Sequence, residues 1–345
     1  MQAYLADLDD PAIWDPQALE AQRAQWDIAL TDDESTLMEK ITTEGTERLG
    51  LWSQTRAIDE WREITAPLAS IFVRVHHALE GGVGIARLRN LPVRTSNTAI
   101  EFDENLLWAI GAHLGRPVNQ MGKGKLLARL QDNRDPKRGR DVRPEDTNEP
   151  LKHHTDGSDL LMLLCVRQAH EGGNSFISSS ARVVREIARR RPDLLPTLLQ
   201  DYFPFDRNEE QPDGDFPYYL TRLCTVINDR ISVRYSRELI DTALKAPGAP
   251  QLTEAQRDLL DTFDQIAAEG GAEVDFKSGD LMIINNYSVL HGRSLFFDPE
   301  DRVEGRLLLR LWLALADARP LPFDFDRGIN TDGAGRGGTP YTVEN

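Results

Sequence analysis

The sequence is poor in cysteine and lacks any long apolar run. Only two of its 345 residues are cysteine, Cys165 and Cys224, which excludes a disulfide-stapled scaffold and a cysteine-rich zinc or iron–sulfur site. No stretch approaches the roughly 18 consecutive apolar residues that a bilayer-spanning helix needs. The N-terminus, MQAYLADLDDPAIWDP, has acidic residues where a signal peptide would carry positive charge. We therefore expect a soluble, cytoplasmic protein without a membrane partner.

Positive charge is also scarce. Lys and Arg number 40 against 56 Asp and Glu, which gives a net charge of -16. A chain this acidic is a poor match for the phosphate backbone of a nucleic acid. An acidic surface still allows a pocket with local arginines, so an anionic small molecule remains a compatible partner. The 40% hydrophobic and 28% charged content is typical of a globular protein with a sizeable core.

Apolar periodicity predicts a mixture of helices and strands. Helices are expected over most of residues 16–80 and over 100–114, 180–199 and 253–269, and strands within 81–93, 125–132, 160–169, 281–292 and 306–316. Residues 132–149 contain 11 charged residues among 18 and no apolar run, so we expect this segment to be a loop, either a solvated excursion or an active-site lid. The order of elements favours one α+β domain over a doubly wound sheet.

The most informative residues are His154-Thr155-Asp156 and His291. In a strand, residues i and i+2 point to the same face, so His154 and Asp156 can bind one ion. Two imidazoles and one carboxylate hold non-haem Fe(II) on one side and leave positions open for a keto acid and O₂. His153 cannot begin the same triplet, because Thr155 stands at the required spacing. An H-x-D triplet alone is weak evidence, so the surrounding motifs decide its weight.

Those motifs are HHTDGSDLLMLLCVRQAHEGGNS around Asp156, KSGDLMIINNYSVLHGR around His291, and GRLLLRLWL after it. In combination they resemble the Fe(II)/2-oxoglutarate dioxygenases of the taurine dioxygenase and clavaminate synthase-like superfamily. The resemblance is strongest over residues 154–180 and 279–315.

The resemblance implies an α+β fold with a double-stranded β-helix core, a cupin-like jelly roll with flanking and inserted helices. Because the sequence shows no convincing interdomain linker, we expect one catalytic domain over residues 1–345. This domain is expected to comprise a helical N-terminal part at 1–80, a jelly-roll core at 81–316 with a helical insert at about 180–270, and a C-terminal extension at 317–345.

The resemblance also implies the cofactors Fe(II), 2-oxoglutarate and O₂. By that analogy His154, Asp156 and His291 hold the metal. Arg306 clamps the distal carboxylate of 2-oxoglutarate, because a guanidinium matches a carboxylate bidentately, and the Ser175 hydroxyl helps to bind it.

Three further residues carry open assignments. Arg302 and Arg310 are alternatives to Arg306 as the keto-acid clamp. Arg310 is otherwise expected to contact the substrate, as is Gln120, which lies where the family places part of its substrate wall.

The implied reaction is hydroxylation of an unactivated C–H bond in a small amino-acid-like or secondary-metabolite substrate, with release of succinate and CO₂. Desaturation, epoxidation and cyclisation use the same oxidant and are not separated from it by sequence. Two other functions stay open: a zinc or manganese hydrolase that uses the same three residues and an activated water, and a non-catalytic metal- or metabolite-binding barrel. The hydrolase leaves the R-x-x-x-R and GGNS motifs without a role. The oligomeric state is open, and a homo-oligomer is compatible with the sequence.

Overall fold

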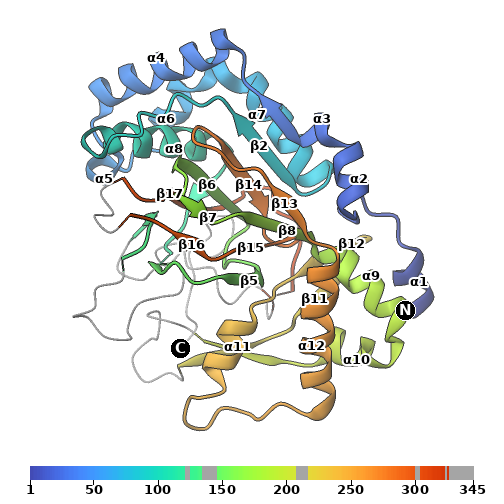
Figure 1. Ribbon diagram of the computed structural model, residues 1–345. Coiled ribbons are helices and arrows are strands. Elements are labelled where there is room, and N and C mark those ends of the chain that lie inside the picture. The colour runs from blue at the N-terminus through green and yellow to red at the C-terminus, as the bar shows by residue number, and fades with distance from the viewer. Residues whose placement is uncertain (121–124, 134–145, 207–216, 300–303, 323–324, 326–345) are drawn as a thin grey trace, which may run out of the picture.

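Two β-sheets enclose a cavity, and helices cover the outside of the larger sheet (Figure 1). The computed structural model describes residues 1–120, 125–133, 146–206, 217–299, 304–322 and 325. Much of the expected loop at 132–149 and most of the C-terminal extension therefore lie outside the described residues.

The larger sheet has seven strands, and its central members are mostly apolar. Its order is β1 (Asp27–Ala29), β2 (Ile85–Arg89), β14 (Leu281–Asn285), β6 (Leu160–Arg167), β17 (Leu307–Ala314) and β3 (Arg116–Pro117), with β4 (Leu127–Leu130) also paired to β17. β1 and β2 are parallel, and the other pairs are antiparallel. β14 is buried along its whole length and β6 and β17 almost so, because these strands are covered on both faces. The predicted strands at 81–93, 125–132, 160–169 and 306–316 are confirmed.

The strands of the smaller sheet contain a higher proportion of polar residues than those of the larger sheet. Its order is β13 (Ala272–Val274), β8 (Ser175–Ser179), β15 (Val289–Arg293) and β5 (Leu151–His154), all antiparallel. The register pairs His291 with His154 on one side and with Ile177 on the other. A two-stranded pair, β7 (Glu171–Gly172) with β16 (Phe296–Phe297), lies beside it. The expected strand at 281–292 is therefore two strands, β14 and β15, which belong to different sheets.

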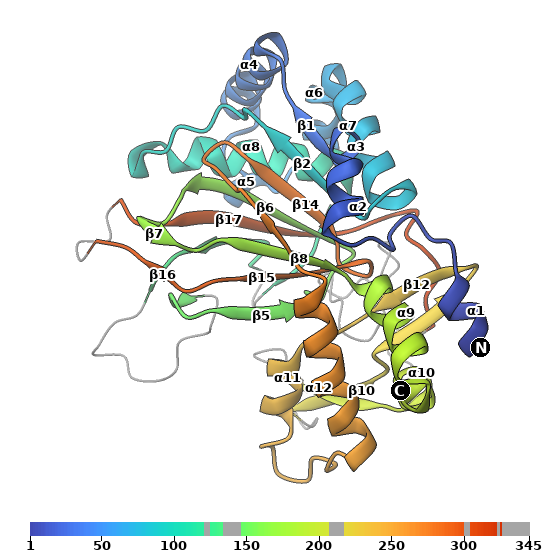
Figure 2. The ribbon, with the colours of Figure 1, turned by 45° about the vertical axis from the view of Figure 1, so that its right-hand side comes forward.

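The N-terminal helices pack on the outer face of the larger sheet (Figure 2). They are α2 (Pro16–Ala21), α3 (Arg23–Trp26), α4 (Asp32–Leu49), α5 (Trp52–Thr55), α6 (Asp59–Ile64), α7 (Ala69–His76) and α8 (Ile100–Leu114). α4 begins at a capping box between Thr31 and Glu34. α8 lies directly on β17, since a Cβ at Gly111 would stand 2.3 Å from Leu311 Cδ2. This close packing fixes the strand that carries Arg310.

A second group of elements, with its own hydrophobic cluster, lies at the far end of the smaller sheet. Its helices are α1 (Gln2–Asp7), α9 (Ser180–Arg190), α10 (Leu195–Gln200), α11 (Arg237–Ala243) and α12 (Glu254–Glu269). α12 begins after Thr253, whose side chain accepts from the Gln256 N–H in a capping box, and it matches the helix expected over 253–269.

The expectation that residues 180–270 form a helical insert was incomplete. Two hairpins occur there, β9 (Phe203–Asp206) with β10 (Tyr218–Thr221), and β11 (Cys224–Ile227) with β12 (Arg230–Val233). Asn228 and Asp229 both have positive φ, as a two-residue hairpin turn requires.

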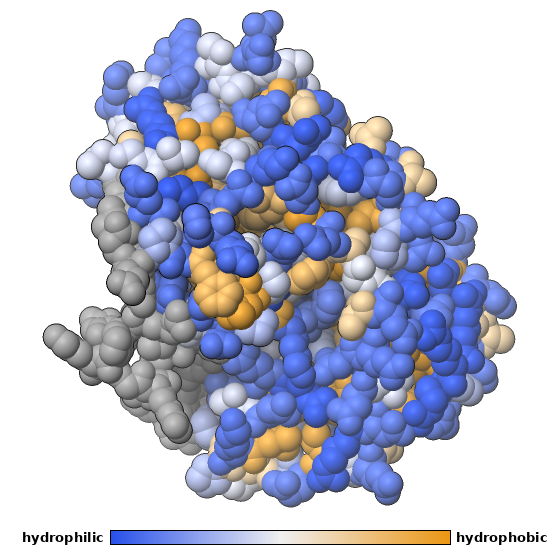
Figure 3. All heavy atoms as spheres, in the orientation of Figure 1, coloured by the Kyte–Doolittle hydropathy of each residue, from blue (hydrophilic) through white to orange (hydrophobic). Residues whose placement is uncertain are grey.

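The face of the molecule in Figure 3 is mostly hydrophilic, with apolar side chains gathered in small patches. Among the described helices, none has the length and apolar character needed to cross a bilayer.

Candidate metal centre

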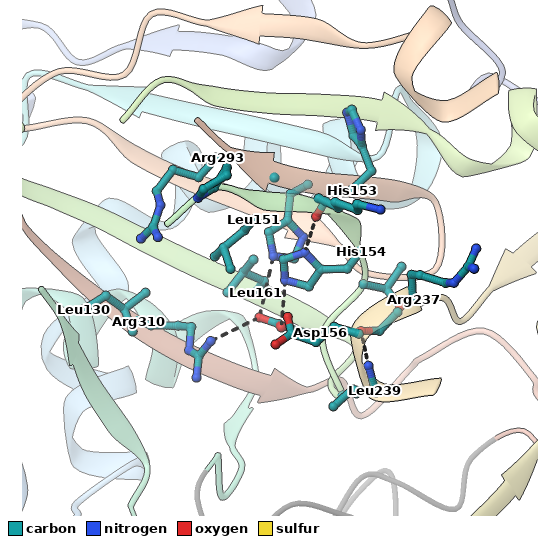
Figure 4. A pocket seen from close by; sticks show the side chains of 18 of the residues that line it. Leu130, Leu151, His153, His154, Asp156, Leu161, Arg237, Leu239, Arg293 and Arg310 are labelled. Atoms are coloured by element: carbon teal, nitrogen blue, oxygen red, sulfur yellow. Dashed lines mark hydrogen bonds and ion pairs between the residues drawn. The ribbon is translucent and has the colours of Figure 1, made fainter. Parts of the chain in front are cut away.

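Three side chains that sequence analysis singled out converge on one point between the sheets (Figure 4). His154 ends β5, Asp156 follows two residues later, and His291 lies in the neighbouring strand β15. Their ligand atoms all lie within 4.8 Å of one another. His154 Nε2 is 3.7 Å from Asp156 Oδ1, and His291 Nε2 is 3.8 Å from Asp156 Oδ2. The antiparallel pairing of β5 and β15 thus joins His154 and His291, which are 137 positions apart in the chain.

Both histidines direct Nε2 at the Asp156 carboxylate. The Nδ1 atom of His154 lies 2.8 Å from the Lys152 carbonyl oxygen. A proton on Nδ1 makes this hydrogen bond and leaves the Nε2 lone pair directed at the centre. Burial, followed by the proximity of His154 and Arg310, holds the pKa of His291 well below its usual range. A neutral imidazole is the form that binds a metal.

The Asp156 carboxylate is held from two sides. The indole Nε1–H of Trp312 donates to Asp156 Oδ2 at 2.9 Å, and Arg310 Nη1 lies 3.8 Å from the same oxygen. The backbone N–H of Asp156 donates to Asn286 Oδ1 at 3.1 Å. Partners of this kind fix the orientation of a metal-binding carboxylate.

Thr155, between the two ligand candidates, ties the centre to the start of α11. Its N–H donates to the Tyr235 carbonyl at 2.7 Å, and the Tyr235 N–H donates back to its hydroxyl at 3.0 Å. Tyr235 stacks on Phe263 of α12 with 4.0 Å between ring centroids. One residue further along, Ser236 caps α11, whose first turn lines the cavity.

His153 does not join the centre. Its Nε2 atom lies 3.3 Å from the position that a Cβ at Gly271 would take, so its ring faces away from Asp156. Burial lowers the pKa of His153 to about 4. The exclusion of His153 from the triplet by spacing is thus matched by its position in the structure.

The cavity at the centre has a volume of about 880 Å³ and a positive lining. Six of its residues are Lys or Arg and four are Asp or Glu, in a chain whose net charge is -16. The cations are Lys152, Arg237, Lys245, Arg293, Arg306 and Arg310. This local reversal of charge favours anionic ligands.

Arg306 and Ser175 line the same cavity. The Arg306 side chain is buried, its guanidinium lies over the Phe296 ring at 5.1 Å, and Nη1 has no hydrogen-bond partner among the described residues. Burial lowers the pKa of Arg306 to about 10, which leaves it charged at neutral pH. Gly173, with φ of +73°, lets the backbone approach, since a Cβ there would stand 3.4 Å from Arg306 Nε. A buried guanidinium with an unused N–H is a site for an anion.

Gln120 and Arg310 also line the cavity, and they hold each other. Arg310 Nε donates to Gln120 Oε1 at 2.7 Å, while Gln120 Nε2 donates to the carbonyls of Arg310 and Leu126. The amide of Gln120 is thus engaged by the protein and orients Arg310. Arg302, the remaining candidate for the clamp, lies outside the described residues.

Sequence reasoning missed Trp312 and Tyr235. Trp312 was read only as an apolar strand residue, although its two-residue spacing from Arg310 placed it on the same face. Tyr235 and α11 had no motif to mark them. Asn286 is a further residue that supports the centre, since it accepts the Asp156 N–H and donates to the Ser158 hydroxyl.

The donor set fits an iron ion. Two neutral imidazoles and one carboxylate on one side suit Fe(II) and leave the cavity side open to further ligands. The buried Arg306 guanidinium and the Ser175 hydroxyl supply the contacts that a dicarboxylate would need at its far end.

Comparison with known proteins agrees with this geometry. The model of the family described as taurine catabolism dioxygenase TauD, TfdA matches residues 56–312. The chain is 30% identical over 250 residues to FR-33289 synthase of Streptomyces rubellomurinus, covering 71% of this chain and 73% of that one. Two solved structures are similar at 18% identity. They are asparagine oxygenase with Fe(II), 3-hydroxyasparagine and succinate (TM-score 0.66, covering 84% and 93% of the two chains) and the non-haem iron oxygenase OrfP with Fe and alpha-ketoglutaric acid (TM-score 0.64, covering 83% and 93%).

Proposed function

The chain belongs to the taurine catabolism dioxygenase TauD, TfdA family and is an Fe(II)- and 2-oxoglutarate-dependent oxygenase, and on this basis we propose that it hydroxylates a C–H bond of a small amino-acid-like or secondary-metabolite substrate. The observation that carries the proposal is the convergence of His154, Asp156 and His291 in a cavity that also contains the buried Arg306, whose Nη1 has no hydrogen-bond partner within the described part of the chain. The printed names of similar proteins support the substrate class, since one oxygenase is bound to hydroxyasparagine.

The same evidence supports a double-stranded β-helix core. We assign the larger and smaller sheets to the two halves of this barrel, with the metal centre between them. One hydrophobic cluster runs from Trp14 through the larger sheet to Leu315, which favours a single catalytic domain that includes the N-terminal helices.

In the proposed mechanism His154, Asp156 and His291 hold the iron, and Arg306 and Ser175 hold the distal carboxylate of 2-oxoglutarate. The chemistry supplied by these bound groups is oxidative decarboxylation of 2-oxoglutarate to succinate and CO₂, coupled to insertion of one oxygen atom into a substrate C–H bond.

The chain's own residues orient the reactants and keep water out. Trp312 and Asn286 fix the Asp156 carboxylate and its backbone. Gln120 fixes Arg310, which stacks on Trp312 with 4.9 Å from guanidinium carbon to ring centroid. In that position Arg310 faces the cavity and attracts an anionic group of the substrate. Leu130, Leu161 and Leu163 form an apolar wall, which limits the access of water to the reacting bond.

A substrate screen tests the proposal. The Fe(II)-loaded enzyme with 2-oxoglutarate and O₂ is incubated with single amino acids, beginning with L-asparagine and L-arginine, and both succinate and substrate mass are followed. We expect one compound to stimulate succinate release and to gain one oxygen atom, with His154→Ala inactive. Hydrolysis products without succinate would contradict the proposal.

A further inference from the structure

A second cavity adjoins the metal centre beyond Arg306. It has a volume of about 220 Å³, and three of its lining residues, Ser175, Arg306 and Leu308, also line the metal cavity. Ser175 and Arg306 are the residues assigned to the distal carboxylate of 2-oxoglutarate. The residues that separate the two cavities are therefore the ones assigned to bind the distal carboxylate of 2-oxoglutarate.

Part of the wall of this second cavity is made of small residues, and the backbone at the two glycines excludes a larger side chain. Gly172 and Gly173 both have φ of +73°, and a Cβ on Gly172 would stand 2.3 Å from the Leu295 carbonyl oxygen. The Ala169 methyl group lies 3.3 Å from the position of a Cβ on Gly173, so it faces this wall. Cys165, fully buried, closes the cavity from β6. Burial raises the pKa of the Cys165 thiol to about 12, so its side chain is a neutral wall.

The charged residues around the second cavity are compatible with binding of a carboxylate group. Arg306 is its buried cation, with Nη1 unpartnered among the described residues. Two acids stand at the exposed rim, and each has a local partner. Asn174 Nδ2 donates to Glu273 Oε1 at 2.6 Å, and Lys277 Nζ lies 2.8 Å from Asp275 Oδ2. Because both acids are exposed, solvent screens them from the buried guanidinium.

We propose that the second cavity is a subsite that lets the enzyme use 2-oxo diacids longer than 2-oxoglutarate, first of all the six-carbon 2-oxoadipate. The inference rests on the assignment of the chain as a 2-oxoglutarate-dependent oxygenase. The added methylene moves the distal carboxylate past Ser175 into the space beside Ala169, where Arg306 still reaches it. The balanced reaction is 2-oxoadipate + O₂ + R–H → glutarate + CO₂ + R–OH.

Anaerobic titration tests the subsite without any substrate. The Fe(II)-loaded enzyme is titrated with 2-oxoglutarate and with 2-oxoadipate, and the visible absorption band of the iron–keto acid chelate is followed. We expect both acids to bind, with dissociation constants within about tenfold of each other. Ala169→Leu fills the second cavity. We expect it to raise the dissociation constant of 2-oxoadipate at least tenfold and that of 2-oxoglutarate less than threefold. His170→Leu, an exposed neighbour outside the cavity lining, is the matched control and should change neither.

Cys165→Met fills the same space from the opposite wall and should reproduce the selective loss if Ala169→Leu fails to fold. Binding of 2-oxoglutarate without 2-oxoadipate in the wild type would overturn the subsite and leave the oxygenase assignment intact, as would equal weakening of both acids by Ala169→Leu. Failure of both acids to bind to the iron-loaded wild type would overturn the co-substrate assignment itself, and the subsite with it.

Discussion

Replacing Trp312 by Phe should weaken metal binding while leaving the cavity wall in place. The indole N–H donates to Asp156 Oδ2 at 2.9 Å, and the Asp156 side chain is only 9% exposed. A hydrogen bond to a charged group contributes about 1.5–3 kcal/mol, which corresponds to about 10- to 150-fold in an equilibrium constant. Arg310 remains 3.8 Å from the same oxygen. We therefore expect the Fe(II) affinity to fall by about tenfold, the lower end of this range.

The assay is anaerobic calorimetric titration of the apoprotein with Fe(II). Trp52→Phe is the matched control, because Trp52 Nε1 donates to a carboxylate oxygen of Glu104 at 3.2 Å, away from the metal cavity. The control should lower the free energy of unfolding and leave the Fe(II) affinity unchanged. A folded Trp312→Phe protein with wild-type Fe(II) affinity would refute the assignment of Trp312 as the residue that orients Asp156.

Three other predictions follow from the same contacts. Thr155→Val removes the hydroxyl that accepts the Tyr235 N–H and should lower the free energy of unfolding, measured by urea denaturation, by about 1–3 kcal/mol. Thr155→Ser keeps the hydroxyl and should stay near wild type. Equal losses of stability in the two variants would argue against the hydrogen bond. Arg306→Met should raise the dissociation constant of 2-oxoglutarate at least 100-fold with Fe(II) affinity unchanged, as measured by anaerobic titration, and a change of less than threefold would exclude it as the clamp. Burial raises the pKa of Asp103 to about 6, so between about pH 4 and 6 the folded state binds more protons than the unfolded state, and the free energy of unfolding falls as pH rises. Asp103→Asn should remove this fall of about 2–3 kcal/mol. Denaturation curves of the variant with the same pH dependence as wild type would contradict the prediction.

The metal ligands could be predicted because their residue types and their local spacing in the sequence are typical of an iron site. Two of them stand two residues apart, at the end of β5 and just after it, and the third lies in a motif that the family shares. The sequence did not indicate that β5 and β15 are neighbours, since strand pairing over 137 residues depends on the whole fold. The structure provides that step through the register of His291 with His154.

The surroundings of the centre were harder to predict. Trp312 looks like any apolar strand residue until the position of Asp156 is known. Gln120 was assigned to the substrate from its place in the chain, whereas its amide is engaged by Arg310 and backbone carbonyls. The hairpin at Asn228-Asp229 carries a turn signal between two short runs rich in β-branched residues, and the expectation of a helical insert over 180–270 missed it. Contacts made by side chains from distant elements leave no pattern in the sequence.

The central claim is that His154, Asp156 and His291 hold iron while Arg306 and Ser175 hold 2-oxoglutarate in the same cavity. The most direct test is to add Fe(II) and then 2-oxoglutarate to the apoprotein without oxygen and to record the visible spectrum. We expect a weak charge-transfer band in the wild type that His154→Ala abolishes and that Arg306→Met shifts to much higher 2-oxoglutarate concentration. A folded, iron-loaded wild type that shows no band at saturating 2-oxoglutarate would contradict it.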